Sequence, residues 1–237
     1  MKSSTKAHIS VSPTEEQFSA LNEAYKYFNQ ALFRNQLPGC ILNFSRKKNT
    51  HGFLAPSRWR RVGNTDHYIH EISLTPYTLY REPLLVFSTL VHEMVHLWQW
   101  EFASPSRNGY HNKEWANKME EVGLIPSDTG KKGGKKTGQA MTHYIEEDGP
   151  YERLFKKMPK QFLLPFTSLE GDLMKSLIEK KKVDGGKRSE QLKKRDKLIS
   201  SGRKKTKYTC PSCKSNVWGR PKLNIVCGTC EAEFKAC

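Results

Sequence analysis

Residues 90–97 place a His-Glu-x-x-His pattern inside an apolar run of strong helix formers. In a helix, residues four positions apart lie on one face, one turn apart. His92 and His96 can therefore direct two imidazole nitrogens at one ion, and zinc binds such nitrogens at about 2.0–2.1 Å. Glu93 adjoins His92 and is placed to act as the general base that activates a zinc-bound water. Because two ligands do not hold a catalytic zinc, the pattern requires a third ligand from elsewhere in the chain.

His111 is the best candidate for that third ligand. It lies fifteen residues after His96, beyond a polar break at 104–109, in a stretch where we expect a second helix over 110–119. An antiparallel return of this helix would bring His111 back to the same ion. Three histidines and an open fourth position are typical of a catalytic zinc rather than a structural one. By residue type alone, the alternative ligands are His51, His67, His70, His143 and Glu114.

Four cysteines near the end of the sequence form two Cys-x-x-Cys pairs, thirteen residues apart. They are Cys210, Cys213, Cys227 and Cys230. This spacing is typical of a closed, four-thiolate structural zinc site on a β-ribbon. A unit so small has too little core to fold without its metal. The sequence therefore predicts one catalytic and one structural zinc ion. Cys40 is expected in the core, and Cys237 as a terminal thiol.

The chain is strongly basic, with a formal net charge of +16 over 237 residues. Ten of these net positive charges fall within residues 175–207, which hold 14 basic and 4 acidic residues. A surplus concentrated in this way favours a polyanionic partner, most simply DNA, held through its phosphates without base readout. A basic helix and a disordered linker both fit the segment. Candidate nucleic-acid contacts, by phosphate binding or stacking, are Lys204, Lys205, Lys207, Lys214, Trp218, Arg220 and Lys222.

The hydrophobic periodicity predicts an α+β domain in which helices pack on a small, mostly antiparallel sheet. Helices are expected over 14–34 and 84–102, strands over 40–44, 51–56, 68–74 and 141–145, and a last packed element within 151–170. Neither an apolar leader nor a run long enough to span a membrane is seen in the sequence. We therefore expect a soluble, cytoplasmic protein that is not secreted, nucleoid-associated in a bacterium, with its cysteines as thiols or metal ligands.

Taken together, these motifs resemble the SprT-like family over about residues 12–165 and in the C-terminal ribbon. The resemblance rests on the His-Glu-x-x-His segment and on the stretch Gly109-Tyr110-His111-Asn112-Lys113-Glu114-Trp115. The strand at 71–76 is also similar to the edge strand of the family. The resemblance implies a compact, zincin-like metalloprotease domain in which His92, His96 and His111 bind zinc and Glu93 is the catalytic base. In Spartan-like members it further implies DNA-dependent proteolysis of proteins crosslinked to DNA.

The resulting domain prediction has four parts. They are a disordered arm (1–12), a SprT-like zinc metalloprotease domain (13–170), a basic linker or helix (171–207) and a four-cysteine zinc ribbon (208–237).

The predicted function is zinc-dependent peptide hydrolysis, acting on DNA-bound or DNA-crosslinked proteins. We expect the substrate backbone to pair with the strand at 72–74, while the basic segment and ribbon hold the enzyme on DNA. His143 or Tyr144 is a candidate hydrogen-bond donor to the oxyanion. The main alternative is a catalytically inactive zincin-fold protein that binds DNA or assists transcription. A zinc hydrolase of non-protein substrates is a third hypothesis.

Overall fold

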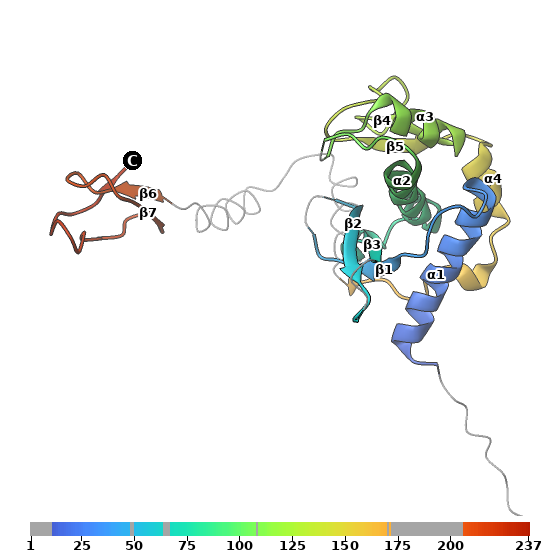
Figure 1. The fold of residues 1–237 in the computed structure, drawn as a ribbon, viewed down its shortest axis with the longest axis horizontal. Helices are drawn as coiled ribbons and strands as arrows, with labels where there is room; N and C mark the ends of the chain where they lie inside the picture. Colours follow the sequence, from blue (N-terminus) through green and yellow to red (C-terminus); the bar gives the residue numbers. More distant parts are fainter. Residues whose placement is uncertain (1–10, 48–49, 64–66, 108, 170, 172–205) are drawn as a thin grey trace, which may run out of the picture. The chain divides into compact units, whose positions relative to one another are not determined.

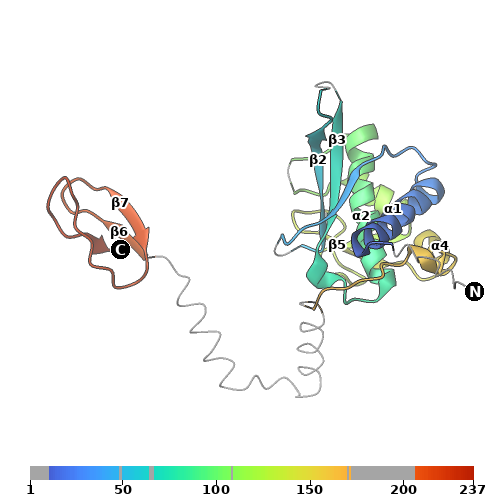
Figure 2. The same ribbon diagram turned by 90° about the horizontal axis from the view of Figure 1, so that it is seen from below.

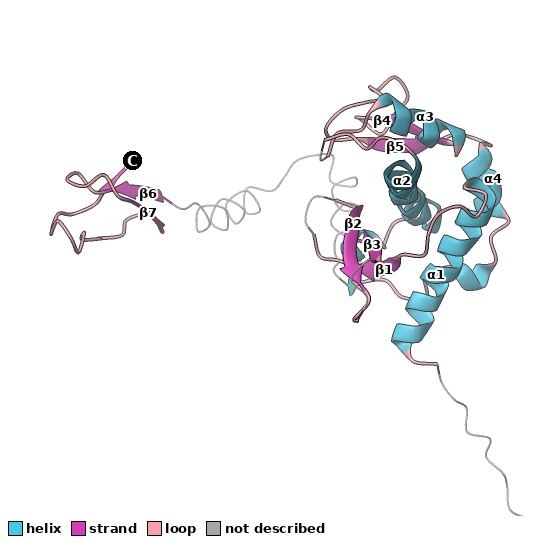
Figure 3. Cartoon of the chain, in the orientation of Figure 1, coloured by secondary structure: helices cyan, strands magenta, loops and turns pink. Residues whose placement is uncertain are grey.

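The computed structural model describes residues 11–47, 50–63, 67–107, 109–169, 171 and 206–237. The chain divides into two compact units, Met1–Ser176 and Leu177–Cys237, which are treated separately below. The first unit mixes helices with small sheets, as expected for an α+β domain (Figure 3). Its elements, with two short 3₁₀ helices η1 and η2, are α1 (Pro13–Leu32), β1 (Ile41–Phe44), β2 (Gly52–Arg60), β3 (Tyr68–Leu74), η1 (Pro76–Thr78), α2 (Pro83–Phe102), α3 (Lys113–Glu121), β4 (Leu124–Ser127), β5 (Thr142–Ile145), α4 (Pro150–Lys156) and η2 (Lys160–Phe162).

Helix α2 runs through the middle of the first unit. The sheet of β1, β2 and β3 lies on one side of it, and α3, β4 and β5 lie on the other (Figures 1 and 2). Most of its residues are buried, because a helix that is apolar nearly all round must be covered on every side. Helices α1 and α4 close the remaining side, where the Tyr151 hydroxyl donates to the Leu84 carbonyl over 2.6 Å. The central helix therefore supplies a fixed platform for its polar side chains.

The three-stranded sheet has the order β1-β3-β2, with β1 parallel and β2 antiparallel to β3. The expectation that residues 72–74 would form an edge strand and pair with substrate is wrong, because β3 is hydrogen-bonded on both sides. Ile72 and Leu74 of β3 are buried, and on the opposite face the Glu71 carboxylate accepts from Trp59 Nε1 and Ser73 Oγ. Strand β2, which packs on α2, is the edge nearest the central helix.

Local signals in the sequence placed most of the elements within a few residues. Helix α1 begins at Pro13, where the Ser12 hydroxyl caps it by accepting from the Glu15 backbone N–H. Strand β2 is longer than the predicted 51–56, because it continues past a bulge between Ala55 and Trp59. Strand β4 was not expected, and it pairs antiparallel with β5.

The second helix of the predicted site is shorter than the expected 110–119. It begins at Lys113, with the Asn112 side chain as its cap. His111 is therefore not helical, and it forms a β-bridge with Gly138 instead. This extended backbone decides how His111 is held, as described below.

The second unit carries a three-stranded antiparallel sheet with the order β7-β6-β8. Its strands are β6 (Thr206–Thr209), β7 (Asn216–Gly219) and β8 (Lys235–Ala236). The buried Tyr208 ring ties the ribbon together, since its hydroxyl donates to the Arg220 carbonyl and accepts from the Leu223 N–H. Within the described parts of the chain, no helix combines the length and apolar character needed to cross a membrane.

Candidate metal centre and cleft

Three histidines from two separate segments meet beside the central helix. Their donor nitrogens all lie within 4.8 Å of one another: His92, His96 and His111. The first two lie one turn apart on α2, and the third comes from the segment before α3. The structure thus brings together the three residues selected from the sequence. It leaves the alternatives His51, His67, His70, His143 and Glu114 outside this group.

His111 is fixed by the backbone on both sides. Its N–H donates to the Gly138 carbonyl over 2.8 Å, and its own carbonyl accepts from the Gly138 N–H over 3.1 Å. His111 Nδ1 also lies 3.2 Å from the Gly138 carbonyl. Because a carbonyl only accepts, Nδ1 must carry the proton, which leaves Nε2 free to bind a metal. Gly109 makes the approach to this bridge with φ +74°, and a Cβ there would meet Gln139 Nε2 at 2.7 Å.

Asn112 locks this segment to the end of α2. Its Oδ1 accepts from the Trp115 backbone N–H over 3.0 Å and from Gln99 Nε2 over 2.7 Å. The Glu114 carboxylate accepts from the Ser104 backbone N–H over 2.9 Å. Glu114 therefore holds the connection between the helices and is not a ligand. The polar residues around His111 in the sequence thus have structural roles that position the histidine.

Trp115 forms the apolar support beneath the three imidazoles. It is fully buried and stacks on the His96 ring at 5.3 Å between centroids and 22° between planes. Its ring also meets His111 edge-on at 4.4 Å and His92 at 5.1 Å. This packing restricts the rotation of all three imidazoles. It explains why a tryptophan follows the third histidine four positions later.

Burial sets the protonation of the histidines. It is the main cause that lowers the pKa of His96 to about 3 and that of His92 well below its usual value, and the neighbouring histidines add to the effect. Burial also lowers the pKa of His111. The three rings are therefore neutral at physiological pH, which is the form that binds metals. Three neutral nitrogen donors that converge next to an open cleft fit a zinc-type site.

Glu93 follows His92 on α2 and is only 5% exposed. Burial raises the pKa of its carboxyl to about 8, while the Leu54 backbone N–H and the Lys47 charge act in the opposite direction. Strand β2 approaches this carboxylate very closely at Gly52. A Cβ at that position would stand 3.2 Å from Glu93 Cγ. The glycine in this strand therefore marks a close approach of β2 to α2.

The three histidines and Glu93 open onto a cleft of about 810 Å³. Strand β2, the end of α2 and the loops around His111 form its walls. Besides the histidines and Glu93, its lining includes Gly52, Phe53, Leu54, Trp100, Tyr110 and Met141. A smaller pocket of about 370 Å³ adjoins His92 and Glu93 on the side of His51, Tyr77 and Thr142. The centre is thus accessible from the cleft.

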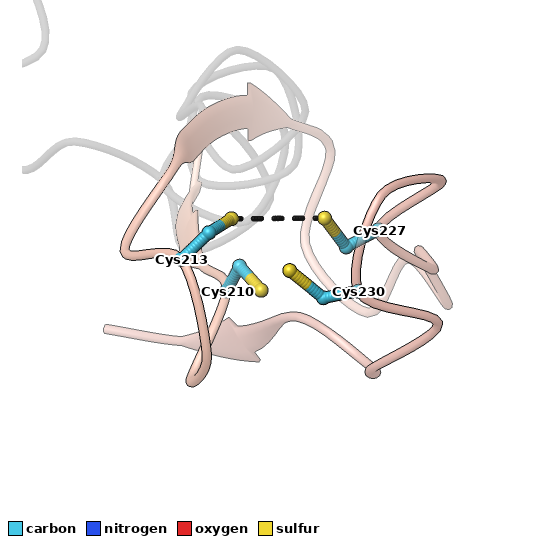
Figure 4. A group of neighbouring side chains, drawn as sticks. All are labelled: Cys210, Cys213, Cys227 and Cys230. Atoms are coloured by element: carbon cyan, nitrogen blue, oxygen red, sulfur yellow. Dashed lines mark hydrogen bonds between the residues drawn. The ribbon is translucent and has the colours of Figure 1, made fainter.

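The four cysteines of the second unit also converge (Figure 4). Their sulfurs all lie within 4.8 Å of one another, and all four thiols are free. Two similar turns present them. The Lys214 N–H donates to the Cys210 carbonyl, the Glu231 N–H donates to the Cys227 carbonyl, and both donors have positive φ. The separation of 3.7 Å between Cys213 and Cys227 is far too long for a disulfide, and four thiolates so placed fit a tetrahedral metal.

Comparison with known proteins agrees with this geometry. The family model described as "SprT-like family" matches residues 21–133, which contain all three histidines and Glu93. An uncharacterized Salmonella typhimurium protein, described as lying in the mucB 3' region, is 39% identical over 56 residues. That alignment covers 24% of this chain and 73% of the Salmonella protein. The chain belongs to the SprT-like family. No solved structure gives a significant match.

The two candidate oxyanion donors of this SprT-like domain lie on β5. His143 faces the centre, but both ring nitrogens are already engaged, by His92 Nδ1 at 3.1 Å and by Ser88 Oγ at 2.9 Å. Tyr144 follows His143 in the strand and so projects from the opposite face. The contacts of His143 and the strand position of Tyr144 argue against this role, which stays a prediction for both residues.

Two further histidines of the SprT-like domain have structural contacts. His70 accepts from the Ser57 backbone N–H at Nδ1 and meets Glu101 through Nε2 at 2.9 Å, so it ties the β2 bulge to α2. His51 lies 3.3 Å from the Arg81 guanidinium at the edge of the smaller pocket. His67 is exposed. None of them could be distinguished from His111 by residue type alone.

The nucleic-acid contacts predicted from the sequence fall partly on the ribbon. Trp218 is 60% exposed. The ribbon's other candidates are exposed as well: Lys207, Lys214, Arg220 and Lys222. Lys204 and Lys205 lie outside the described residues, as does most of the predicted basic segment. The ribbon therefore has an accessible aromatic ring with cationic neighbours.

Proposed function

We propose that the chain is a zinc-dependent metallopeptidase that acts on proteins bound or crosslinked to DNA. One observation carries the peptidase part: three neutral histidine nitrogens converge within 4.8 Å beside a buried glutamate, at the wall of an accessible cleft. Membership of the SprT-like family supports it. Such a constellation is the minimum set for metal-assisted hydrolysis.

Each residue has a role in this proposal. His92, His96 and His111 would hold the metal, which would lower the pKa of a bound water towards about 7 and polarise the scissile carbonyl. Glu93 takes the proton from the attacking water and passes it to the leaving amine nitrogen. Its burial makes the carboxylate a stronger base than an exposed one.

Strand β2 is the proposed docking edge for the substrate. The Leu54 N–H is directed at Glu93 and hence away from β3. By strand alternation, the backbone groups of residues 52 and 54 face the cleft, while those of 53 and 55 pair with β3. An extended peptide that lay alongside these groups would bring its backbone to the metal centre, with little demand on side chains.

DNA would contribute by concentrating the enzyme near its targets. The exposed Trp218 offers a face for base stacking, and the cations around it, with those of residues 175–207, would contact phosphates. A DNA-bound protein next to an enzyme held in this way is at high effective concentration. This explanation requires no recognition of substrate sequence.

The test is cleavage of a DNA-binding protein without DNA, with single-stranded DNA and with duplex DNA. We expect DNA-stimulated cleavage by the zinc-loaded chain. Glu93→Gln should abolish cleavage and retain zinc and DNA binding, whereas Glu82→Gln, at an exposed residue before α2, should cleave normally. If the zinc-loaded wild type binds DNA but cleaves no protein under any condition, the inactive DNA-binding alternative replaces the peptidase.

A further inference from the structure

His143 connects two residues on the same face of α2. Its Nδ1 lies 3.1 Å from Nδ1 of His92, and its Nε2 lies 2.9 Å from Oγ of Ser88. Ser88 and His92 are four residues apart and so are neighbours on the helix surface. His143 lies on β5, and its ring contacts both of these α2 residues. The Ser88 hydroxyl in turn donates to the Leu85 carbonyl over 3.0 Å.

The protons in this chain of contacts can be assigned from its far end. The Leu85 carbonyl only accepts, so the single Ser88 proton is used there, and Ser88 Oγ accepts from His143. His143 therefore carries its proton on Nε2, and its Nδ1 is an acceptor. Since His143 Nδ1 accepts, His92 Nδ1 must be the donor. Nε2 of His92 is then left without a proton.

This outcome is the one that a metal site requires. A neutral imidazole binds a metal through its unprotonated nitrogen, and the hydrogen bond made by the other nitrogen fixes which one that is. If every proton were reversed, Nε2 of His92 would carry a hydrogen and could not bind the metal. His111 is set in the same way by the Gly138 carbonyl. For His92, a side chain sets the tautomer, whereas for His111 the backbone does.

We propose that His143 is a positioning residue that fixes the tautomer and ring orientation of the metal ligand His92, with Ser88 setting the tautomer of His143. This inference rests on the proposed metal site and assigns His143 a role that excludes direct contact with the substrate. Ser88 and His92 are both buried, so an unmatched N–H or lone pair in this chain has no water to replace its partner. Loss of the acceptor at His143 therefore weakens the site at its first ligand.

The experiment measures zinc affinity in the full chain by competition with a chelator. His92→Ala identifies which of the two bound ions belongs to the histidine site, and the cysteine-bound ion serves as an internal reference. His143→Leu removes the acceptor and should weaken the histidine site by about 10–100-fold, the usual effect of losing such a partner. His143→Asn keeps an acceptor oxygen close to the position of Nδ1 and should recover most of the affinity. Ser88→Ala should weaken it by a smaller factor.

The outcomes separate the inference from the proposed function. Unchanged zinc affinity in His143→Leu, with the ion lost in His92→Ala, overturns the inference and leaves the peptidase proposal intact. Reduced turnover at unchanged zinc affinity would also overturn it, in favour of a direct catalytic role. If wild type binds no metal at the histidines, the proposed function itself fails. If His143→Leu does not fold, the comparison of His143→Asn, Ser88→Ala and wild type decides, and equal affinity in all three refutes the positioning role.

Discussion

Gly52→Ala tests how closely β2 must approach the central helix. An added Cβ would stand 3.0 Å from Thr89 Cγ2, 3.1 Å from the Ser73 carbonyl oxygen and 3.2 Å from Glu93 Cγ. Two of these atoms belong to α2 and the third to the backbone of β3. Contacts this short do not relax by rotation of one flexible side chain. The strand and the helix would have to separate by a few tenths of an ångström.

Overpacking of this kind typically costs about 1–3 kcal/mol of stability. Because one of the displaced residues is Glu93, activity should fall as well. Misplacement of a reacting group by about 1 Å can cost roughly 100-fold in rate, so a shift of a few tenths should cost on the order of tenfold. Zinc binding should persist, since none of the three close contacts is a metal ligand.

The measurement is the free energy of unfolding in urea at fixed zinc, together with zinc per chain and the cleavage rate. Gly39→Ala is the matched control, because Gly39 has no heavy atom within 4 Å of an added Cβ and no positive φ. That control should be neutral or more stable by about 0.4–1 kcal/mol, since alanine restricts the unfolded chain. Equal stability and equal cleavage in the two variants would refute the close approach of β2 to Glu93.

Three other outcomes follow from the site. His111→Ala should bind one zinc ion per chain where wild type binds two, by metal analysis, and two ions in the variant would remove His111 from the ligand set. The metal-free chain should lose stability on acidification. Burial lowers the pKa of His96 and of His143 to about 3 from an unfolded value near 6.5, so their contribution is present above pH 6.5 and is lost as pH falls towards 3. Each should reduce the free energy of unfolding by about 1.4 kcal/mol per pH unit in urea titrations with chelator, while protonation of Glu93, whose pKa is raised to about 8, offsets about one histidine's share down to pH 4.5. A flat profile from pH 6.5 to 4 would contradict the neutral burial of the two histidines. Asn112→Ala should cost about 1 kcal/mol or more in thermal unfolding, against little change for Asn117→Ala on the exposed face of α3, and equal melting temperatures would exclude the cap.

The sequence predicted those parts of the fold that depend on residues close together in the chain. Helix α1 carries a serine cap and a proline in its first turn, and α2 begins at a proline. Helical spacing alone places His92 and His96 on one face. The third histidine of the cluster was also predicted, because only His111 follows that helix in a stretch similar to one family. For the helix starts and the His92–His96 pair, residues close in sequence determine the geometry.

The order of the strands could not be obtained in this way. Apolar and polar residues alternate along β3, with Glu71 and Ser73 on the polar face. A central strand and an edge strand can both show this pattern. Those two polar residues are buried because they bond to each other and to Trp59, which lies beyond a bulge in β2. Pairing between distant segments decides which edge is free. Because β3 lies between β1 and β2, the free edge beside the cleft belongs to β2.

The same limit applies to the groups that set the ligand protons. Gly138 and His143 lie after the end of the family match at residue 133. Gly138 is in the loop that joins β4 to β5, and His143 is in β5 itself. The loop between these strands is held by its own contacts, such as the Lys135 backbone N–H on the Asp128 carboxylate. The family match therefore contains the candidate metal ligands and the proposed base, but not the two contacts that we propose prepare His92 and His111 to bind a metal. Changes in this loop should therefore alter zinc affinity before they alter the fold. The loop supplies only the Gly138 carbonyl that contacts His111, whereas His92 and His96 lie on α2 and His111 lies just before α3.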